Sequence, residues 1–66
     1  MPSSVIRSHR YLQDVETLII TFMSGKIYQY SGVSKVQYEE FRQAYSKGTY
    51  FNKYIKPFHP FKELIS

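Results

Sequence analysis

Residues 17–30, TLIITFMSGKIYQY, contain the pattern that decides the fold of this chain. The first half is rich in apolar and β-branched residues. Because side chains alternate along a strand, three of them share one face: Leu18, Ile20 and Phe22. Ser24-Gly25 interrupts the run, and glycine accepts the positive φ that a tight turn requires. A second strand, 26–30, follows the turn. The stretch therefore predicts an antiparallel hairpin.

The segments on either side extend this hairpin. Upstream, residues 5–11 have mixed polarity and predict an edge strand, which a turn at 13–16 joins to the hairpin. Downstream, Ser34 and Gln37 have the spacing of a capping box and begin a helix. At roughly 100° per residue, the apolar arc of this helix consists of Tyr38, Phe41, Ala44 and Tyr45.

A glycine and a proline delimit a second helix. Gly48 is expected to end the first helix in a left-handed conformation. A short helix over 49–55 follows, and Pro57 ends it because the residue before a proline avoids helical geometry. Phe51 and Ile55 are four residues apart and share the buried face of this helix. We expect Phe22 and Phe51 to be the core residues that join the sheet to the helices.

These elements predict an α+β fold: a three-stranded antiparallel meander followed by two short helices packed on one sheet face. The 66 residues are enough for a single domain, 1–66, with a core over about 3–56 and an extended tail over 57–66. A hydrophobic content of 42% and an aromatic content of 18% argue against disorder.

The chain contains no cysteine, which excludes a disulfide framework, a thiolate zinc site and a cysteine nucleophile. A domain this small is normally cross-linked in an oxidising compartment, so we expect a cytoplasmic protein. The longest apolar run, 18–20, is far shorter than the roughly 20 residues that span a bilayer, so a membrane partner is not expected.

Catalysis is not expected, and neither is a metal or another cofactor. The two histidines, His9 and His59, lie in neither a nucleophile elbow nor a metal-ligand spacing. Glu39 and Glu40 are adjacent and so point to different faces of the first helix, whereas paired-carboxylate chemistry needs two acids that converge on one point. The pattern favours a binding protein over an enzyme.

Positive charge and aromatic residues concentrate near the C-terminus. The formal net charge is +4, and residues 41–62 contain five Lys or Arg, no Asp or Glu, and seven aromatic residues. Basic groups neutralise phosphates and aromatic rings stack on bases, so this interleaving is typical of a nucleic-acid surface. The alternative is that the aromatic residues fill a small core and the lysines face solvent.

The best candidate site is the joint between the two helices, residues 46–53. Lys47 lies near the start of the second helix, where anions are favoured, and Lys53 and Lys56 are three residues apart and share a face. Tyr50 would stack on a base, and Asn52 would contact a base edge or a phosphate. The predicted nucleic-acid-binding residues are Arg42, Lys47, Tyr50, Asn52, Lys53 and Lys56. The structural alternative is that Gly48 only permits a turn, Phe51 anchors the core and Asn52 caps a helix.

Tyr28 and Tyr30 admit two interpretations. On an exposed sheet face they would stack on bases, as in sheet platforms that bind single-stranded RNA. Opposite the apolar face of the neighbouring strand they would be cross-strand partners with buried rings. We favour the core interpretation.

The order of several motifs resembles a known family. They are Ser3-Ser4, Leu18–Phe22, Ser24-Gly25, Tyr28-Gln29-Tyr30, Gly32-Val33, Ala44, Ser46-Lys47-Gly48, Tyr50-Phe51-Asn52 and Ile55. Over about residues 3–59 the chain is similar to the KTSC domain, named after the C-terminus of some lysyl-tRNA synthetases and also found as small free-standing bacterial proteins. It departs from the family at Arg10-Tyr11-Leu12, at Ser34 in place of the usual Pro, and in the Pro57–Phe61 tail. The resemblance suggests RNA binding, from the synthetase context, and brings no established biochemical activity with it.

Three functions remain open at this level. The leading one is a non-catalytic module that binds RNA or another nucleic acid through its basic, aromatic C-terminal half. The second is a protein-interaction module that uses the 5–11 edge strand and the aromatic tail, because edge strands accept a partner strand. The third is a protein that captures a small nucleotide between protomers. The sequence leaves the ligand and the oligomeric state open.

Overall fold

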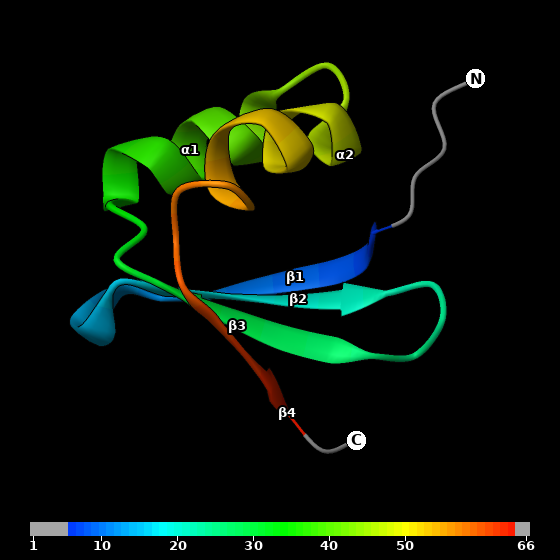
Figure 1. The fold of residues 1–66 in the computed structure, drawn as a ribbon. Coiled ribbons are helices and arrows are strands. Elements are labelled where there is room, and N and C mark those ends of the chain that lie inside the picture. Colours follow the sequence, from blue (N-terminus) through cyan, green and yellow to red (C-terminus); the bar gives the residue numbers. More distant parts are fainter. Residues whose placement is uncertain (1–5, 65–66) are drawn as a thin grey trace.

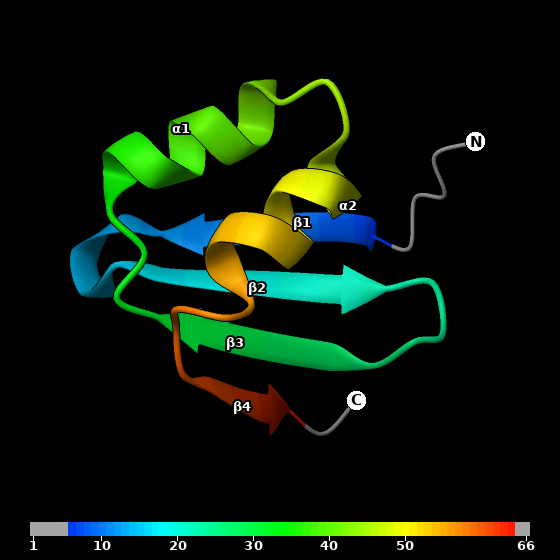
Figure 2. The same ribbon diagram turned by 45° about the horizontal axis from the view of Figure 1, so that its top comes forward.

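The hairpin predicted from residues 17–30 forms the centre of the sheet in the computed structural model, which describes residues 6–64. Its strands are β2 (Thr17–Phe22) and β3 (Ile27–Ser31). On one side β1 (Ile6–Leu12) pairs with β2, and on the other β4 (Phe61–Leu64) pairs with β3. The order is β1-β2-β3-β4, with every neighbouring pair antiparallel (Figure 2).

The helical segments after β3 all lie on one face of this sheet, and no element of residues 6–64 covers the other face, which we call the uncovered face (Figure 1). They are α1 (Lys35–Gln43), α2 (Lys47–Tyr50) and η2 (Phe51–Ile55), a π-helical turn that continues α2 directly. A short 3-10 turn, η1 (Gln13–Val15), joins β1 to β2. The predicted α+β class and the packing of the helices on one sheet face are confirmed. Ser3, Ser4 and Val5, which the predictions included, lie outside the described residues.

The turn of the hairpin depends on Gly25, whose φ is 95°. The Gly25 N–H donates to the Phe22 carbonyl at 2.9 Å, and the Phe22 N–H donates to the Lys26 carbonyl at 2.8 Å. The loop between these bonded residues is therefore Met23-Ser24-Gly25, one residue longer than the predicted Ser24-Gly25. The prediction placed glycine correctly, because only its position needs a positive φ here.

The core lies between the sheet and the helices. Its buried side chains are Ile6, Leu18, Ile20, Tyr30, Val33, Phe41, Phe51 and Ile55. Phe51 and Ile55 share the buried face of η2, as predicted, whereas the Phe22 ring is half-buried at the edge of the core. The Tyr11 hydroxyl donates to the Val33 carbonyl at 2.7 Å, and its ring stacks on Tyr38 at 4.5 Å. These contacts tie β1 to the start of the helical layer.

The tail forms a fourth strand, so the prediction of a three-stranded meander was one strand short. Residues 61–64 pair with the edge of β3, which would otherwise leave a row of backbone groups unpaired. The pairing begins where the Ser31 N–H donates to the Pro60 carbonyl at 3.0 Å. The Phe61 ring then packs against Tyr28, with 5.3 Å between the ring centroids.

His59 and Gln37 direct the tail towards β3. His59 Nδ1 lies 3.0 Å from the Ser31 carbonyl, and its Nε2 lies 2.8 Å from Gln37 Oε1. Gln37 Nε2 in turn donates to the Tyr54 carbonyl at 2.9 Å. Ser34 caps α1 as predicted, because its Oγ accepts from the Gln37 N–H at 3.1 Å. The Gln37 side chain, however, links α1, η2 and the tail instead of completing a capping box.

The joint between the helices differs from the prediction. α1 ends at Gln43, and Ala44 is extended, with ψ 145°. Tyr45 therefore leaves the apolar arc of the helix and is fully exposed. Ser46 begins a new helix, since its Oγ accepts from the Thr49 N–H at 3.3 Å.

Gly48 is consequently not a left-handed residue at a helix end. It lies inside α2, it is buried, and the glycines with positive φ among the described residues are Gly25 and Gly32. The prediction was wrong because the chain leaves α1 through extended backbone at Ala44 and Ser46, so no left-handed residue is required.

Candidate nucleic-acid interface

The helix joint forms an open, aromatic concavity of about 530 Å³, which we call the tyrosine groove. Its lining residues are Ala44, Tyr45, Ser46, Thr49, Tyr50, Lys53 and Tyr54. The groove forms because α1 ends at Gln43, which leaves Tyr45 outside the core. On its other side, Tyr50 and Tyr54 are four residues apart and face the same side of the α2–η2 helix. No carboxylate is among the lining residues.

Tyr50 is the fixed member of this cluster. Its hydroxyl donates to Glu40 Oε1 at 2.8 Å, and its ring lies 4.9 Å from Tyr54 and 6.3 Å from Phe41. Burial, and then the hydrogen bond to Glu40, raise the pKa of Tyr50 to about 12, so the phenol is neutral at physiological pH. Tyr45 and Tyr54 are exposed and leave ring faces open to a ligand.

Sequence reasoning included Tyr50 in the site but not Tyr45 or Tyr54. The i,i+4 spacing of Tyr50 and Tyr54 was a usable signal for the second of these. Tyr45 had no such signal, because helical periodicity assigned it to the core and only the early end of α1 exposes it.

The predicted basic residues are distributed around the helix joint. Lys53 lines the tyrosine groove, whereas Lys56 and Asn52 line a second concavity on the other side of η2. Lys53 and Lys56 do not share a face as predicted, because the wide π-turn rotates less per residue than an α-helix, so residues three apart fall further short of a full turn. Lys47 is half-buried at the start of α2.

Arg42 is engaged by an acidic neighbour. Its Nη2 and Nε donate to Glu39 Oε1 at 2.8 and 3.2 Å. This hydrogen bond, with the guanidinium charge, holds the pKa of Glu39 below its usual value. Among the described residues Arg42 forms an ion pair with a carboxylate and the lysines form none. Arg42 is therefore less available to a phosphate than the lysines.

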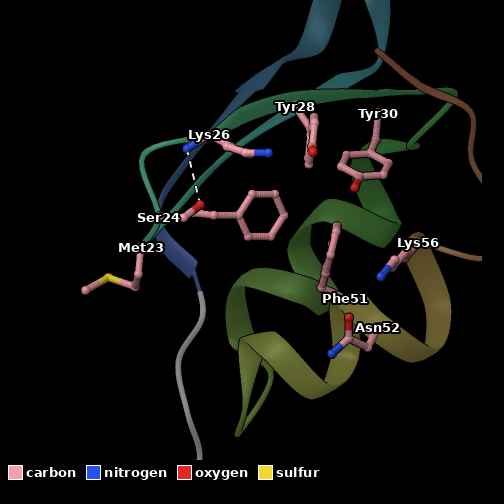
Figure 3. A pocket seen from close by; sticks show the side chains of 9 residues that line it. Met23, Ser24, Lys26, Tyr28, Tyr30, Phe51, Asn52 and Lys56 are labelled. Atoms are coloured by element: carbon pink, nitrogen blue, oxygen red, sulfur yellow. Dashed lines mark hydrogen bonds between the residues drawn. The ribbon is translucent and has the colours of Figure 1, made fainter. Parts of the chain in front are cut away.

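The second concavity, which we call the hairpin pocket, has a volume of about 580 Å³ and lies between the β2–β3 hairpin and η2 (Figure 3). Its lining residues are Phe22, Met23, Ser24, Lys26, Tyr28, Tyr30, Phe51, Asn52 and Lys56. Tyr28 and Tyr30 point from β3 towards the helices (Figure 3). Tyr30 is buried against Phe51 at 5.0 Å, and burial raises the pKa of its hydroxyl.

The uncovered face of the sheet carries no aromatic side chain in the described strands. The strand aromatics contact one another or the helices instead: Tyr11, Phe22, Tyr28, Tyr30 and Phe61. Tyr28 and Tyr30 are thus not an open sheet platform, and their core interpretation agrees with the structure.

The His9 side chain lies near the positive charges of Lys47 and Arg42 at the helix joint. Its ring packs edge-on against Phe41 at 5.1 Å, and its Nδ1 lies 3.3 Å from the Tyr38 hydroxyl. Burial lowers the pKa of His9, and the nearby charges of Lys47 and Arg42 lower it further. The folded chain therefore favours the neutral imidazole.

Stability should consequently depend on His9 in mild acid. Below about pH 6.5 the unfolded chain binds more protons at this residue than the folded chain, so acidification favours unfolding. Relative to His9→Gln, the parent is expected to lose unfolding free energy as the pH falls from about 7 to 5. Urea denaturation of both proteins across this range measures the difference, and a parent that gains on the variant would contradict the assignment.

Metal-binding and membrane-spanning features can be assessed over residues 6–64. Within that range no group of three or more His, Cys, Asp or Glu side chains is arranged to hold a metal ion. No helix in the described part of the chain is long and apolar enough to cross a membrane.

Comparison with known proteins identifies relatives of two kinds. Lysine–tRNA ligases from Nostoc punctiforme and Nostoc sp. are 43% and 41% identical to this chain over 61 residues, which is 92% of its length. The chain spans 11% of each ligase, so the similarity concerns a small part of those proteins. The crystal structure of a KTSC domain protein from Yersinia pestis has a TM-score of 0.90 and 34% identity, covering 98% of this chain and 92% of that one.

The family itself is defined by a sequence model. The KTSC domain model matches residues 2–59, which include β1 to η2 and the turn that precedes β4. The motifs from Tyr28-Gln29-Tyr30 to Ile55 that suggested the family lie within this match. This chain therefore belongs to the KTSC domain family.

Proposed function

We propose that this chain is a non-catalytic module that binds single-stranded RNA across the α2–η2 helix. The observation that carries the proposal is the tyrosine groove, which places two exposed rings and a lysine in one concavity without an acidic lining residue. Proteins that bind single strands combine stacking rings with cations that follow the phosphate backbone.

The groove and the lysines have complementary roles in this proposal. Tyr54 and Tyr45 offer faces on which unpaired bases stack, while Tyr50 is held in place by Glu40. Lys53 lies beside the rings, and Lys47 begins the same helix, so both supply charge to the phosphates between stacked bases. Lys56, on the other side of η2, extends the positive surface around the helix.

The relatives support an RNA partner. Two of them are named for a tRNA that they charge with lysine, and this chain corresponds to a small part of each. In this proposal the small basic domain holds the RNA on which such an enzyme acts, because phosphate contacts supply affinity without sequence selectivity. We expect the binding to take place in the cytoplasm.

A protein-interaction role has less support. It uses the 5–11 edge strand and the aromatic tail. β1 does lie at an edge of the sheet, but residues 61–64 of the tail pair with β3 and Phe61 packs on Tyr28. We retain it as the interpretation to adopt if RNA binding is absent.

The proposal predicts a salt-dependent affinity that three lysines control. If Lys47, Lys53 and Lys56 neutralise about three phosphates, the logarithm of the affinity for single-stranded RNA should fall against log salt with a slope near −2. Changing all three to Glu should abolish this slope and most of the binding. A fluorescence titration with a labelled oligouridylate at several salt concentrations measures both quantities.

A charge-matched variant separates a site from a general effect of net charge. Arg10, Lys35 and Lys62 are exposed and line neither concavity, so changing these three to Glu should leave the slope close to that of the parent. Tyr54→Ala should weaken binding by about 1 to 3 kcal/mol at every salt concentration, because it removes a stacking surface and not a charge. Parent affinity no tighter than about 10⁻⁴ M, the non-specific level, would remove RNA binding from consideration.

A further inference from the structure

We propose that the hairpin pocket is a binding site for a nucleoside 5′-monophosphate, with the base against the aromatic residues and the phosphate between Lys26 and Lys56. This site is separate from the tyrosine groove, and it requires no polynucleotide. The two concavities have no lining residue in common.

The aromatic part of the pocket is preformed. Phe51 and Tyr30 are buried and lie edge to face at 5.0 Å, and Phe22 is edge to face with Phe51 at 5.7 Å and with Tyr28 at 5.4 Å. Phe51 fixes the half-buried Phe22 ring, which contacts the half-buried Tyr28 ring, so the two accessible rings lose little freedom when a planar group binds against them. A volume of about 580 Å³ is in the range of small-molecule sites.

The charge of the pocket selects an anion. Lys26 comes from the hairpin and Lys56 from the end of η2, and Figure 3 shows the Lys56 ammonium group directed towards Phe51 and the Lys26 side chain directed along the hairpin towards Tyr28. Both side chains are exposed, and no carboxylate of residues 6–64 lines the pocket. The nearest acid along the sheet is Glu63, which pairs with Tyr28 across the β3–β4 ladder and is not a lining residue. Two cations that approach from opposite walls suit one phosphate.

Polar groups beside the rings suit a base. The Asn52 amide borders the pocket next to Phe51 and offers one donor and one acceptor in a plane, which is the pattern that reads the edge of a base (Figure 3). Ser24 and the Tyr28 and Tyr30 hydroxyls add further donors and acceptors around the same space. An apolar ligand would form no hydrogen bond or ion pair with these groups or with the two lysines. A nucleotide would contact the rings and the Asn52 amide with its base and the lysines with its phosphate.

NMR spectroscopy with AMP, CMP, GMP and UMP tests the assignment on the full chain. The Phe22 and Tyr28 rings line the pocket and are half-buried, so a bound base should shift their ring-proton signals through ring currents. At least one nucleotide should saturate this shift with a dissociation constant below about 1 mM. Adenosine or another nucleoside, and inorganic phosphate alone, should each bind at least tenfold more weakly, because each lacks half of the recognised chemistry.

Paired variants test the two lysines. Lys26→Glu with Lys56→Glu should weaken nucleotide binding at least tenfold, whereas Lys35→Glu with Lys62→Glu, with the same change of net charge, should preserve it. Asn52→Ala should reduce the preference among the four bases. The proposal is overturned if no nucleotide shifts the Phe22 or Tyr28 signals, if nucleoside and nucleotide bind equally, or if both double variants behave alike. Lys56 takes part in both tests, so the single variant Lys26→Glu, which changes no residue of the RNA titration, separates the nucleotide result from the outcome for RNA.

Discussion

Replacing Phe51 with Ala is expected to unfold most of the molecules at room temperature. The side chain is only 2% exposed, and its ring lies 5.0 Å from Tyr30 and 5.7 Å from Phe22. It is therefore the point at which η2 packs on both strands of the hairpin. Truncating a buried Phe costs about 3 to 5 kcal/mol through lost transfer free energy and a residual cavity. A single core of this size rarely supplies more than about 3 to 5 kcal/mol of net stability.

Two further Phe→Ala variants are expected to lose less unfolding free energy than Phe51→Ala. Phe22→Ala should cost less than Phe51→Ala, because the Phe22 ring is half-buried. Phe58 is 72% exposed, so Phe58→Ala should change the unfolding free energy by no more than about 0.5 kcal/mol. Thermal melts followed by circular dichroism rank the three variants. If Phe51→Ala melted within a few degrees of the parent, that result would contradict the packing of η2 on the hairpin described above.

A comparably large loss of unfolding free energy is expected for Ile20→Asn. Its control is Ile19→Asn, at the neighbouring position on the opposite face of the sheet. Ile20 is fully buried under the helices, whereas Ile19 is half-buried on the uncovered face, opposite Gln29. Asn at position 20 loses the apolar contacts and buries an amide without a partner, together at least about 4 kcal/mol. Asn at position 19 remains accessible to water and should cost much less.

The pair of variants tests which face of the sheet is the core. Urea denaturation gives the unfolding free energy of each variant. The two values are directly comparable, because both variants carry the same substitution on the same strand. Similar losses at the two positions would mean that the uncovered face is also buried, for example against a second copy of the chain.

Local sequence was enough for the parts of the fold that depend on neighbours along the chain. Side-chain alternation in residues 17–30 identified β2 and β3, because a strand buried on one face needs alternating side chains. Ser34 marked the start of α1, since its Oγ satisfies an unpaired backbone N–H. The order of Ser46-Lys47-Gly48 and Tyr50-Phe51-Asn52 was specific enough to indicate the KTSC family, which the match to residues 2–59 confirms.

Tertiary structure alone decided how the basic C-terminal half is divided. The pattern of charges along residues 41–62 predicted one surface, but Arg42 is paired with Glu39, and the π-turn directs Lys53 and Lys56 to different concavities. The rim of the hairpin pocket also requires Lys26, which is thirty residues from Lys56 in sequence. Spacing along a helix carries no information about a partner from the sheet.

The fourth strand and the exposed Tyr45 have the same kind of origin. β4 forms because β3 has an open edge and because His59 and Gln37 direct the tail towards it, and both depend on contacts between residues far apart in sequence. Tyr45 is exposed because the chain becomes extended at Ala44, where capping of the next helix by Ser46 prevails over the apolar period of α1. The sequence by itself determined the local elements and the family, whereas only the packed structure decided which faces, edges and cations meet, because those depend on long-range contacts that no local pattern encodes.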